Sequence, residues 1–248
     1  MAGLTVVMPM AGRGSRFAQV GYQAPKPLID VMGKPMYAWA TDGLPLEHAT
    51  KLIFICLEEH LRGLGLKEDI ERRYGQYKPE VISLSKVTQG QACTVLEARE
   101  HIAPAHPLLI FNADTWCKTS LAARLPQLVA QYAGVLGVFE APGDRWSFAR
   151  TDETGRVVEV AEKKRISNWA STGLYLFSSG REFVAEADAM IAADERVNGE
   201  FYVAPLYNRL IAKGRPVAID VAEDVGVMGT PEDLAQFLEH PRHGSRRR

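Results

Sequence analysis

Short apolar runs alternate with longer segments of helical pattern, and this alternation limits the fold more than any other feature of the chain. Four runs are dense in branched or aromatic residues: LTVVMPM (4–10), KLIFICL (51–57), EVISL (80–84) and PLLIF (107–111). They are too short for buried helices, so they predict central strands of a mainly parallel sheet. Helix candidates lie between them at 34–44, 58–75 and 90–102. Strand and helix in alternation imply right-handed crossovers and a doubly wound sheet.

The second half of the chain adds antiparallel strands to this pattern. Residues 134–141 form a further buried run, and residues 147–163 are typical of two strands joined by a turn at Glu153, Thr154 and Gly155. The remaining elements are predicted at 171–179 and 217–221 (strands) and at 180–193, 200–213 and 230–240 (helices). The fold class is therefore α/β, with a doubly wound, mixed but mainly parallel sheet. Because no repeat or Pro/Gly-rich linker interrupts the chain, we expect one domain at 1–240 and a basic tail at 241–248.

Charge and cysteine content exclude several classes of protein. A formal net charge of −1 provides no global field for nucleic acid or an anionic membrane, and the cluster RHGSRRR (242–248) is typical of a solvated tail. Cys56, Cys93 and Cys117 are an odd number without a CxxC pair, which fits a reducing compartment. There is no signal pattern, and no apolar run approaches the ~20 residues of a membrane span. We therefore expect a cytoplasmic protein that binds neither nucleic acid nor membrane.

An apolar run followed at once by glycines and cations predicts a phosphate-binding loop. In MPMAGRGSR (8–16), Gly12 and Gly14 let backbone N–H groups approach an anion closely, because no Cβ intervenes. Arg16 and Lys26 supply countercharge to a polyphosphate, and the prolines on either side of Lys26 restrict its backbone. Doubly wound sheets bind ligands at the carboxyl ends of strands, where this loop begins. Neither a Walker loop nor a three-glycine dinucleotide fingerprint is present.

This loop carries a family resemblance. MPMAGRGSRF (8–17) followed by PKPLIDVMGKPM (25–36) resembles the nucleotidyltransferases that activate sugar 1-phosphates and related esters. That family includes glucose-1-phosphate thymidylyltransferases and phosphocholine cytidylyltransferases of surface-polysaccharide pathways. The resemblance covers nearly the whole chain and implies the Rossmann-like nucleotide-diphospho-sugar transferase fold, with a triphosphate-binding half (1–132) and an acceptor-binding half (133–240). It places near the base and ribose Ala11 and Gly12, and near the phosphates Gly14, Ser15, Arg16 and Lys26.

Two further segments match the nucleotide half of that family. TQGQACTVLEA (88–98) resembles the segment that contacts the base, with Gln91 where threonine is usual, and makes Gln89 and Gly90 candidates for base contacts. An ordinary helix start is the alternative. In PLLIFNADTW (107–116), a buried strand ends at Asp114, where the family has a metal-binding aspartate. A carboxylate there suits Mg²⁺ held jointly with substrate phosphates, and the alternative is a cap for the next helix.

The acceptor half matches through VAEKKRISNWASTGLYLF (160–177). Glu162, Lys163 and Gly173 correspond to family residues that hold the hydroxyls and phosphate of the acceptor, although Lys164 stands where proline is usual. A plain surface charge run is the alternative reading. The segment NGEFYVAPLYNRLI (198–211) predicts mostly helix packing, with Asn198 and Glu200 as additional candidates for contact with the acceptor.

The second metal ligand of the family is missing. Relatives commonly have an aspartate two residues before Gly-Thr-Pro-Glu-Asp-Leu, and this chain has Val227 there. Asp224 is the substitute that we predict, with Asp220 and Glu223 as alternatives. The GTPEDL segment itself predicts a helix start, with Thr230 as the cap and acidic residues beside the helix dipole.

The predicted activity is Mg²⁺-dependent transfer of a nucleoside monophosphate from a triphosphate to a phosphorylated small molecule, such as a sugar 1-phosphate, with release of pyrophosphate. A metal-dependent nucleotide-sugar glycosyltransferase is one alternative, although such enzymes usually carry Asp-x-Asp. A catalytically silent nucleotide sensor is another. The departures at Gln91, Lys164 and Val227 also leave room for a cytidylyltransferase that acts on a non-sugar phosphate. The nucleobase and the oligomeric state stay open.

Overall fold

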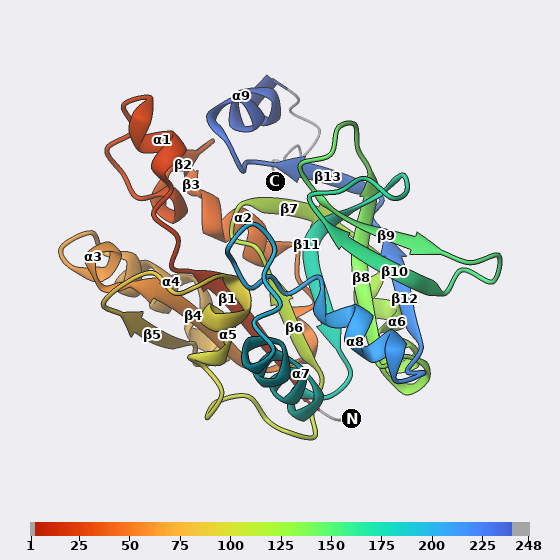
Figure 1. Ribbon diagram of the computed structural model, residues 1–248. Coiled ribbons are helices and arrows are strands. Elements are labelled where there is room, and N and C mark those ends of the chain that lie inside the picture. Colours follow the sequence, from red (N-terminus) through yellow and green to blue (C-terminus); the bar gives the residue numbers. More distant parts are fainter. Residues whose placement is uncertain (1–2, 240–248) are drawn as a thin grey trace.

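The computed structural model describes residues 3–239, and a nine-stranded mixed sheet runs through its centre (Figure 1). In its first half, β1 pairs in parallel with β4 and β6, and β4 pairs in parallel with β5. The second half joins through β11, which is antiparallel to both β6 and β8, while β12 is parallel to β8. The predicted mixed, mainly parallel sheet is therefore confirmed. The strands are β1 (Leu4–Met10), β4 (Ala49–Leu57), β5 (Glu80–Leu84), β6 (Leu108–Phe111), β8 (Gly134–Glu140), β9 (Ser147–Thr151), β10 (Val157–Glu162), β11 (Trp169–Phe177) and β12 (Val217–Val221).

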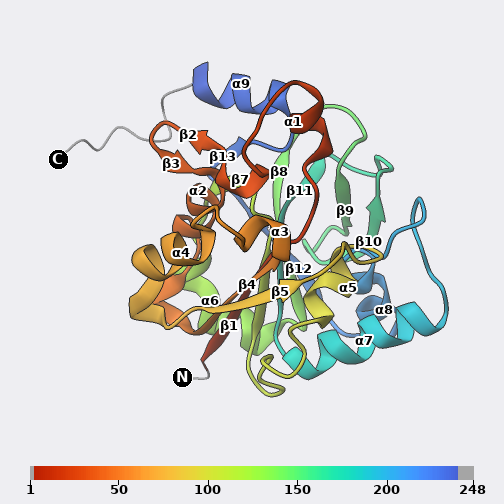
Figure 2. The ribbon, with the colours of Figure 1, turned by 90° about the vertical axis from the view of Figure 1, so that its left-hand side faces the viewer.

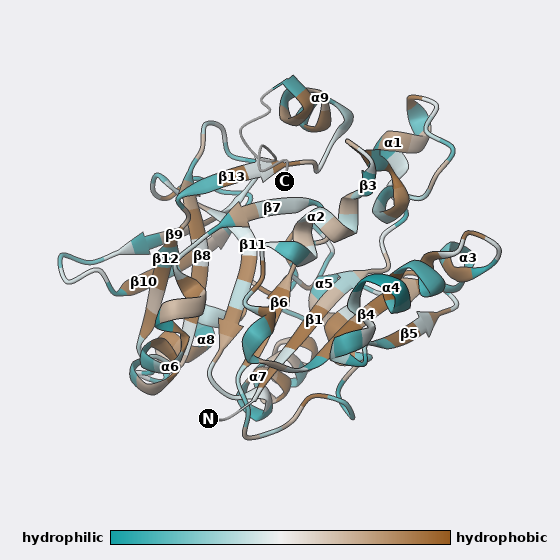
Figure 3. Cartoon of the chain, turned by 180° about the vertical axis from the view of Figure 1, so that it is seen from behind, coloured by the Kyte–Doolittle hydropathy of each residue, from teal (hydrophilic) through white to brown (hydrophobic). Residues whose placement is uncertain are grey.

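Helices cover both faces of the sheet. Alternate residues of one strand point to opposite faces, so Val7 of β1 contributes to one buried cluster and its neighbours Val6 and Met8 contribute to the other. The first cluster is completed by α5 (Gln91–Leu96), α7 (Gly180–Ala192) and α8 (Leu206–Ala212). The second is completed by α2 (Met36–Asp42), α4 (Leu66–Tyr74) and α6 (Leu121–Gln131). Figure 3 shows the central strands as the most hydrophobic part of the chain, as expected for strands buried on both faces.

Several helices are shorter than their sequence pattern predicts. The predicted helix at 58–75 is two helices, α3 (Glu58–Leu61) and α4, because Gly63 and Gly65 between them have positive φ values of 68° and 67°. Glycine adopts this left-handed conformation without the steric cost that other residues meet. The predicted helix at 200–213 begins only at Leu206, so residues 198–205 form a loop beside the cleft described below.

The structure contains two short strand pairs that the sequence did not indicate, and the second of them brings the C-terminal segment next to the residues that follow β6. One pair is β2 (Asp30–Val31) with β3 (Lys34–Pro35). In the other, β7 (Thr115–Lys118) pairs antiparallel with β13 (Asp224–Val227), and Val227 lies opposite Thr115. Asp114, the predicted metal ligand, lies directly before β7. It is therefore adjacent to the segment that begins α9 (Pro231–Glu239).

The last helix packs against the start of the chain. Figures 1 and 2 both show α9 close to α1 (Ser15–Gln19) at one end of the molecule. A separate buried cluster joins them, formed by Phe17, Ile29, Val31, Met36, Trp39, Met228, Leu234 and Phe237. The predicted basic tail, 241–248, lies outside the described residues. Within residues 3–239, no helix combines the length and the apolar character that crossing a membrane requires.

Candidate active site

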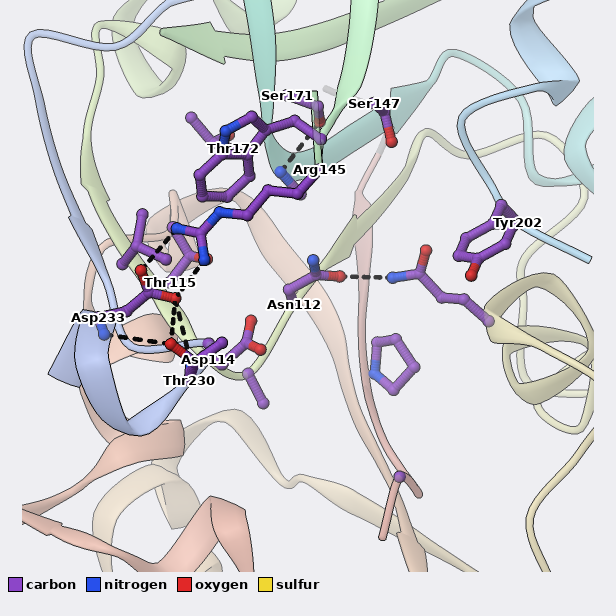
Figure 4. Close-up of a pocket in the computed structure, with 18 of the residues that line it drawn as sticks. Asn112, Asp114, Thr115, Arg145, Ser147, Ser171, Thr172, Tyr202, Thr230 and Asp233 are labelled. Carbon is purple, nitrogen blue, oxygen red and sulfur yellow. Dashed lines mark hydrogen bonds and ion pairs between the residues drawn. The ribbon is translucent and has the colours of Figure 1, made fainter. Parts of the chain in front are cut away.

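An open cleft of about 820 Å³ lies at the carboxyl ends of β1 and β6, and both halves of the chain line it (Figure 4). From the first half come the glycine loop, the segment at Lys26, and the residues that follow β6. From the second half come the segment that joins β8 to β9, the end of β10, the middle of β11 and the start of α9. A cleft at the carboxyl edge of a doubly wound sheet is where such folds bind ligands.

The glycine loop owes its shape to Gly14. Gly14 has a φ of 62°, and a Cβ there would lie 2.7 Å from the Cβ of Lys26. The absence of a side chain therefore lets the loop pack directly on the segment that carries Lys26. Gly12, Gly14 and Arg16 all line the cleft. One wall of the cleft therefore consists of a glycine turn and a guanidinium group.

Lys26 joins three segments that are far apart in the sequence. Its ammonium group forms an ion pair with Oδ2 of Asp114 and donates a hydrogen bond to the carbonyl oxygen of Gly229 at 2.9 Å. The side chains of Lys26 and Asp114 are 21% and 26% exposed, so both remain accessible from the cleft. A cation and a carboxylate thus meet at the edge of the sheet. The cation suits a phosphate, and the carboxylate suits a divalent metal ion.

The other predicted nucleotide-binding residues are placed differently. Ala11 is buried directly after β1. Ser15 lines a second cavity of about 810 Å³, together with Arg13 and Lys86. Gln89 and Gly90 are tied to the 198–205 loop, because the Phe201 N–H donates to the Gln89 carbonyl at 2.9 Å. Gln91 lies in the cleft instead, where its side chain donates to Oδ1 of Asn112.

The wall formed by the second half of the chain, which we call the acceptor wall after its predicted role, contains the predicted pair Glu162 and Lys163. Ser147 donates its hydroxyl hydrogen to Glu162, and Lys163 donates to the hydroxyl of Tyr202 while lying 4.6 Å from the centre of that ring. Sequence reasoning missed Ser147 and Tyr202. Ser147 lies opposite Glu162 in the predicted hairpin of β9 and β10, but no motif marks it as a cleft residue. Tyr202 reaches the cleft through a contact with Lys163, which is 39 residues away in the sequence.

Gly173 sits at an irregularity in β11, where the pairing with β8 shifts between Ser171 and Tyr175. Its φ is 83°, its N–H donates to Oγ of Ser171 at 3.0 Å, and its carbonyl accepts from the Asn112 N–H at 3.2 Å. A Cβ at this position would lie 2.3 Å from Nδ2 of Asn112. The close approach of β11 to the residue after β6 therefore depends on glycine.

Substitution of Gly173 by alanine should destabilise the fold more than the same change at Gly155. Gly155 has nearly the same φ, 81°, but nothing lies within 4 Å of the Cβ that alanine would add. Gly155→Ala should therefore cost only the left-handed backbone penalty of about 1 kcal/mol, or roughly 2–4 °C in Tm for a chain of this size. Gly173→Ala should lower Tm further and also lower turnover. Equal Tm values for the two variants would contradict the proposed contact with Asn112.

The predicted second metal ligand is not brought to the cleft. Val227 lines it, whereas Asp224 lies at the opposite end of β13, paired with Lys118. The alternatives are engaged elsewhere: Asp220 is buried against Arg124 at 3.0 Å, and Glu223 pairs with Lys118 at 2.6 Å. No group of three or more His, Cys, Asp or Glu residues that could hold a metal occurs within residues 3–239. Asp114 is thus the predicted ligand that the structure places in the cleft.

Thr230 caps α9 as predicted. The Asp233 N–H donates to Oγ1 of Thr230 at 3.2 Å, and the Thr230 N–H donates to Oδ2 of Asp233 at 3.1 Å. This reciprocal pair is a capping box in which aspartate takes the place of glutamate. It fixes the segment whose Gly229 carbonyl binds Lys26.

Comparison with known proteins agrees with this geometry. A family model described as "Nucleotidyl transferase" matches residues 5–238. The chain belongs to the nucleotidyl transferase family. Among curated relatives, this nucleotidyl transferase is 25% identical to a UTP–glucose-1-phosphate uridylyltransferase of Haloferax volcanii over 93% of each chain. It is 24% identical to a glucose-1-phosphate thymidylyltransferase of Xanthomonas campestris pv. campestris over 92% of this chain and 78% of that protein.

A solved structure has the same fold. The nucleoside-diphosphate-sugar pyrophosphorylase from Vibrio cholerae RC9 superimposes on this nucleotidyl transferase with a TM-score of 0.82. The two are 29% identical over 95% of this chain and all of that one. The predicted resemblance and fold are thereby confirmed.

Proposed function

We propose that the cleft transfers a nucleoside monophosphate from a nucleoside triphosphate to a sugar 1-phosphate, with release of pyrophosphate. The observation that carries this proposal is the meeting of Lys26, Asp114 and the Gly229 carbonyl on one wall of a cavity whose other wall holds Glu162 and Lys163. Cations on both walls suit two phosphate-bearing substrates that must approach each other.

The reaction places modest demands on the protein. An oxygen of the acceptor phosphate attacks the α-phosphorus in line, the new P–O bond forms, and the bond to the β-phosphate oxygen breaks, with its electron pair leaving on pyrophosphate. The nucleophile is an anion at neutral pH, so no strong general base is required. The site must position two mutually repelling anions and neutralise their charge. Arg16 and Lys26, both on the glycine-loop wall, are suited to the triphosphate.

The residues at the end of β6 fit a magnesium ion. Mg²⁺ prefers oxygen ligands and usually binds through one or two carboxylates together with substrate phosphates and water. Asp114 provides a partly exposed carboxylate at this position. When bound there, the ion would withdraw charge from the phosphate oxygens that it contacts. We propose that Asp114 holds Mg²⁺ and that Lys26, its partner in the present structure, then turns to the phosphates.

The acceptor wall favours a polyhydroxylated ring. Its lining combines hydrogen-bonding groups with aromatic rings, from Trp146, Ser147, Glu162, Ser171, Thr172 and Tyr202. The Thr172 hydroxyl is buried and has no hydrogen-bond partner within residues 3–239. Both curated relatives named above act on glucose 1-phosphate, which supports the same acceptor class here.

We further propose that the product serves the synthesis of a surface polysaccharide, and that the protein is located in the cytoplasm. The resemblance of the glycine loop to enzymes of such pathways supports the first point. The free cysteines Cys56, Cys93 and Cys117 support the second, because reduced thiols are typical of that compartment.

A thermal-shift panel tests the nucleotide, with ATP, CTP, GTP, UTP and dTTP each measured with and without Mg²⁺. A ligand at a hundred times its Kd stabilises by about 2.7 kcal/mol, and each kcal/mol raises Tm by roughly 2–4 °C for a chain of this size. We expect one pyrimidine triphosphate with Mg²⁺ to dominate. Pyrophosphate release is then measured with glucose 1-phosphate and, separately, phosphocholine. Release with phosphocholine alone would overturn the sugar assignment, and binding without release for either would support a nucleotide sensor.

Glu162 gives the stability of the fold a specific pH dependence. Burial raises the pKa of this carboxyl above its ordinary value, although the Ser147 hydroxyl and the charge of Lys163 act in the opposite direction. Such a group stabilises the fold at pH values below its ordinary pKa, and this contribution is lost as the pH rises through the raised pKa. Glu162→Gln should therefore flatten the decline of Tm across that window. Glu153→Gln, in the exposed turn, is the control, and identical pH slopes for wild type and Glu162→Gln would contradict the prediction.

A further inference from the structure

Arg145 lines the cleft, and the proposed reaction assigns no role to it. It lies in the segment that joins β8 to β9, immediately before Trp146 and Ser147. Its two terminal nitrogens donate to the two carboxylate oxygens of Asp233, at 3.1 Å and 2.5 Å. The guanidinium carbon also lies 4.3 Å from the centre of the Trp146 ring. Figure 4 shows the side chain reaching across to Asp233 at the start of α9.

These contacts fix the orientation of the guanidinium plane. Asp233 is only 7% exposed and is itself held by the backbone and hydroxyl of Thr230. Trp146 packs edge-on against Phe139, with ring centres 5.4 Å apart. A guanidinium has five N–H donors, and the pairing with Asp233 uses two of them. Three donors therefore remain on a group that lines the cleft with half of its side-chain surface exposed.

The same arrangement occurs twice around Gly229. A Cβ built on Gly229 would lie 3.6 Å from Oδ2 of Asp114 and 3.5 Å from Oδ2 of Asp233. Asp114 holds Lys26 and Asp233 holds Arg145. Two cations, each oriented by its own carboxylate, thus flank one backbone position, Lys26 from the glycine-loop wall and Arg145 from the acceptor wall.

We propose that Arg145 binds the phosphate of the acceptor and that Asp233 is the positioning residue that orients it. The inference rests on the proposed nucleotidyl transfer and assigns its acceptor phosphate a specific contact. The acceptor phosphate is favoured over the triphosphate because the neighbours of Arg145 in the chain belong to the acceptor wall, where Ser147 binds Glu162. Lys163, the other cation on that wall, uses one of its three ammonium donors on Tyr202 and can share the phosphate with Arg145. A planar fork with free donors matches the geometry of a phosphate better than an ammonium group does.

Initial rates of pyrophosphate release test this assignment, with glucose 1-phosphate varied at saturating triphosphate and then the triphosphate varied at saturating glucose 1-phosphate. Hydrogen bonds to a charged group contribute about 1.5–3 kcal/mol, or roughly a ten- to hundredfold change. Arg145→Ala should raise the KM for glucose 1-phosphate by that factor and leave the KM for the triphosphate within about twofold. Arg145→Lys should recover little, because lysine lacks the fork, and Asp233→Asn should raise the same KM by a smaller factor.

The control is Arg150→Ala. Arg150 also makes two hydrogen bonds to one carboxylate, that of Glu159, but on the exposed surface of β9 and β10. It should leave both KM values unchanged. Tm is measured for every variant, and Arg145→Gln, which keeps the aliphatic stem and a polar amide without the charge, replaces Arg145→Ala if the latter unfolds. An unchanged KM for glucose 1-phosphate, or a rise confined to the triphosphate, would overturn the proposal.

Failure of the proposed function would look different. If wild type released no pyrophosphate with any acceptor, nucleotidyl transfer to these acceptors would be refuted, and the contact would be tested by calorimetric titration with glucose 1-phosphate alone. Binding by wild type and Arg150→Ala but not by Arg145→Ala would uphold the phosphate contact. Equal binding by all three would refute it.

Discussion

Replacement of Lys26 by alanine should lower turnover roughly a hundred- to a thousandfold, the usual effect of removing one preorganised electrostatic contact from an active site. The ammonium group joins the Asp114 carboxylate to the Gly229 carbonyl. Its loss removes countercharge from the triphosphate and frees Asp114 from its partner. Steady-state pyrophosphate release at saturating substrates measures the change.

Lys34→Ala is the matched control for Lys26→Ala. Lys34 also pairs with an aspartate, Asp42 at 2.8 Å, but it lies in β3, and neither partner lines the cleft. Both substitutions should lower stability only slightly, because a partly exposed ion pair contributes about 1 kcal/mol or less. Near-normal turnover in Lys26→Ala with an unchanged Tm would remove this lysine from the active site.

Asp114→Asn should have an effect of similar size through a different cause. The substitution keeps the shape of the side chain and one acceptor oxygen, but it removes the negative charge that a divalent cation needs. We expect lower turnover together with a higher Mg²⁺ concentration for half-maximal rate. A Mg²⁺ titration of the rate separates this variant from Lys26→Ala, whose Mg²⁺ requirement should change less.

Asp224→Asn decides between two positions for metal binding. Asp224 lies in β13 opposite Lys118, at the end of the strand that is remote from Val227. Its substitution should leave turnover and the Mg²⁺ requirement unchanged. A loss in Asp224→Asn equal to that in Asp114→Asn would show that the C-terminal segment moves toward the cleft when substrate binds.

Much of the fold was predictable because its central strands are buried on both faces. The apolar run 4–10 coincides with β1 to the residue, since no charged position blurs its ends. The run 80–84 also coincides with β5, although this strand lies at the edge of the sheet and is only partly buried. Helix boundaries were less accurate. Positive-φ glycines divide the segment 58–75, and residues 198–205 form a loop in which Phe201 binds the segment at Gln89 through backbone hydrogen bonds. Tertiary contacts of this kind leave no periodicity in the sequence.

The site was predictable where its residues follow a strand in a fixed local pattern. The glycine loop follows β1 directly and Asp114 follows β6 after two intervening residues, and the structure brings Gly12, Arg16, Lys26 and Asp114 to one cleft. The sequence did not reveal which residues meet across the cleft. Arg145 and Asp233 are 88 residues apart, and GTPEDL predicted the helix cap that Asp233 forms but not its pairing with Arg145. Such pairs depend on the register of β7 with β13, which four-residue strands do not specify in advance.

The packing of α9 on the glycine-loop segment also determines when the site can form as the chain is synthesised. Lys26 leaves the ribosome 203 residues before Gly229, its hydrogen-bond partner, an interval of roughly 10–40 s at ordinary translation rates. During that time Phe17, Ile29 and Trp39 lack the apolar surfaces of Met228, Leu234 and Phe237 that later cover them. The proposed site is therefore incomplete until Gly229 and α9 have left the ribosome.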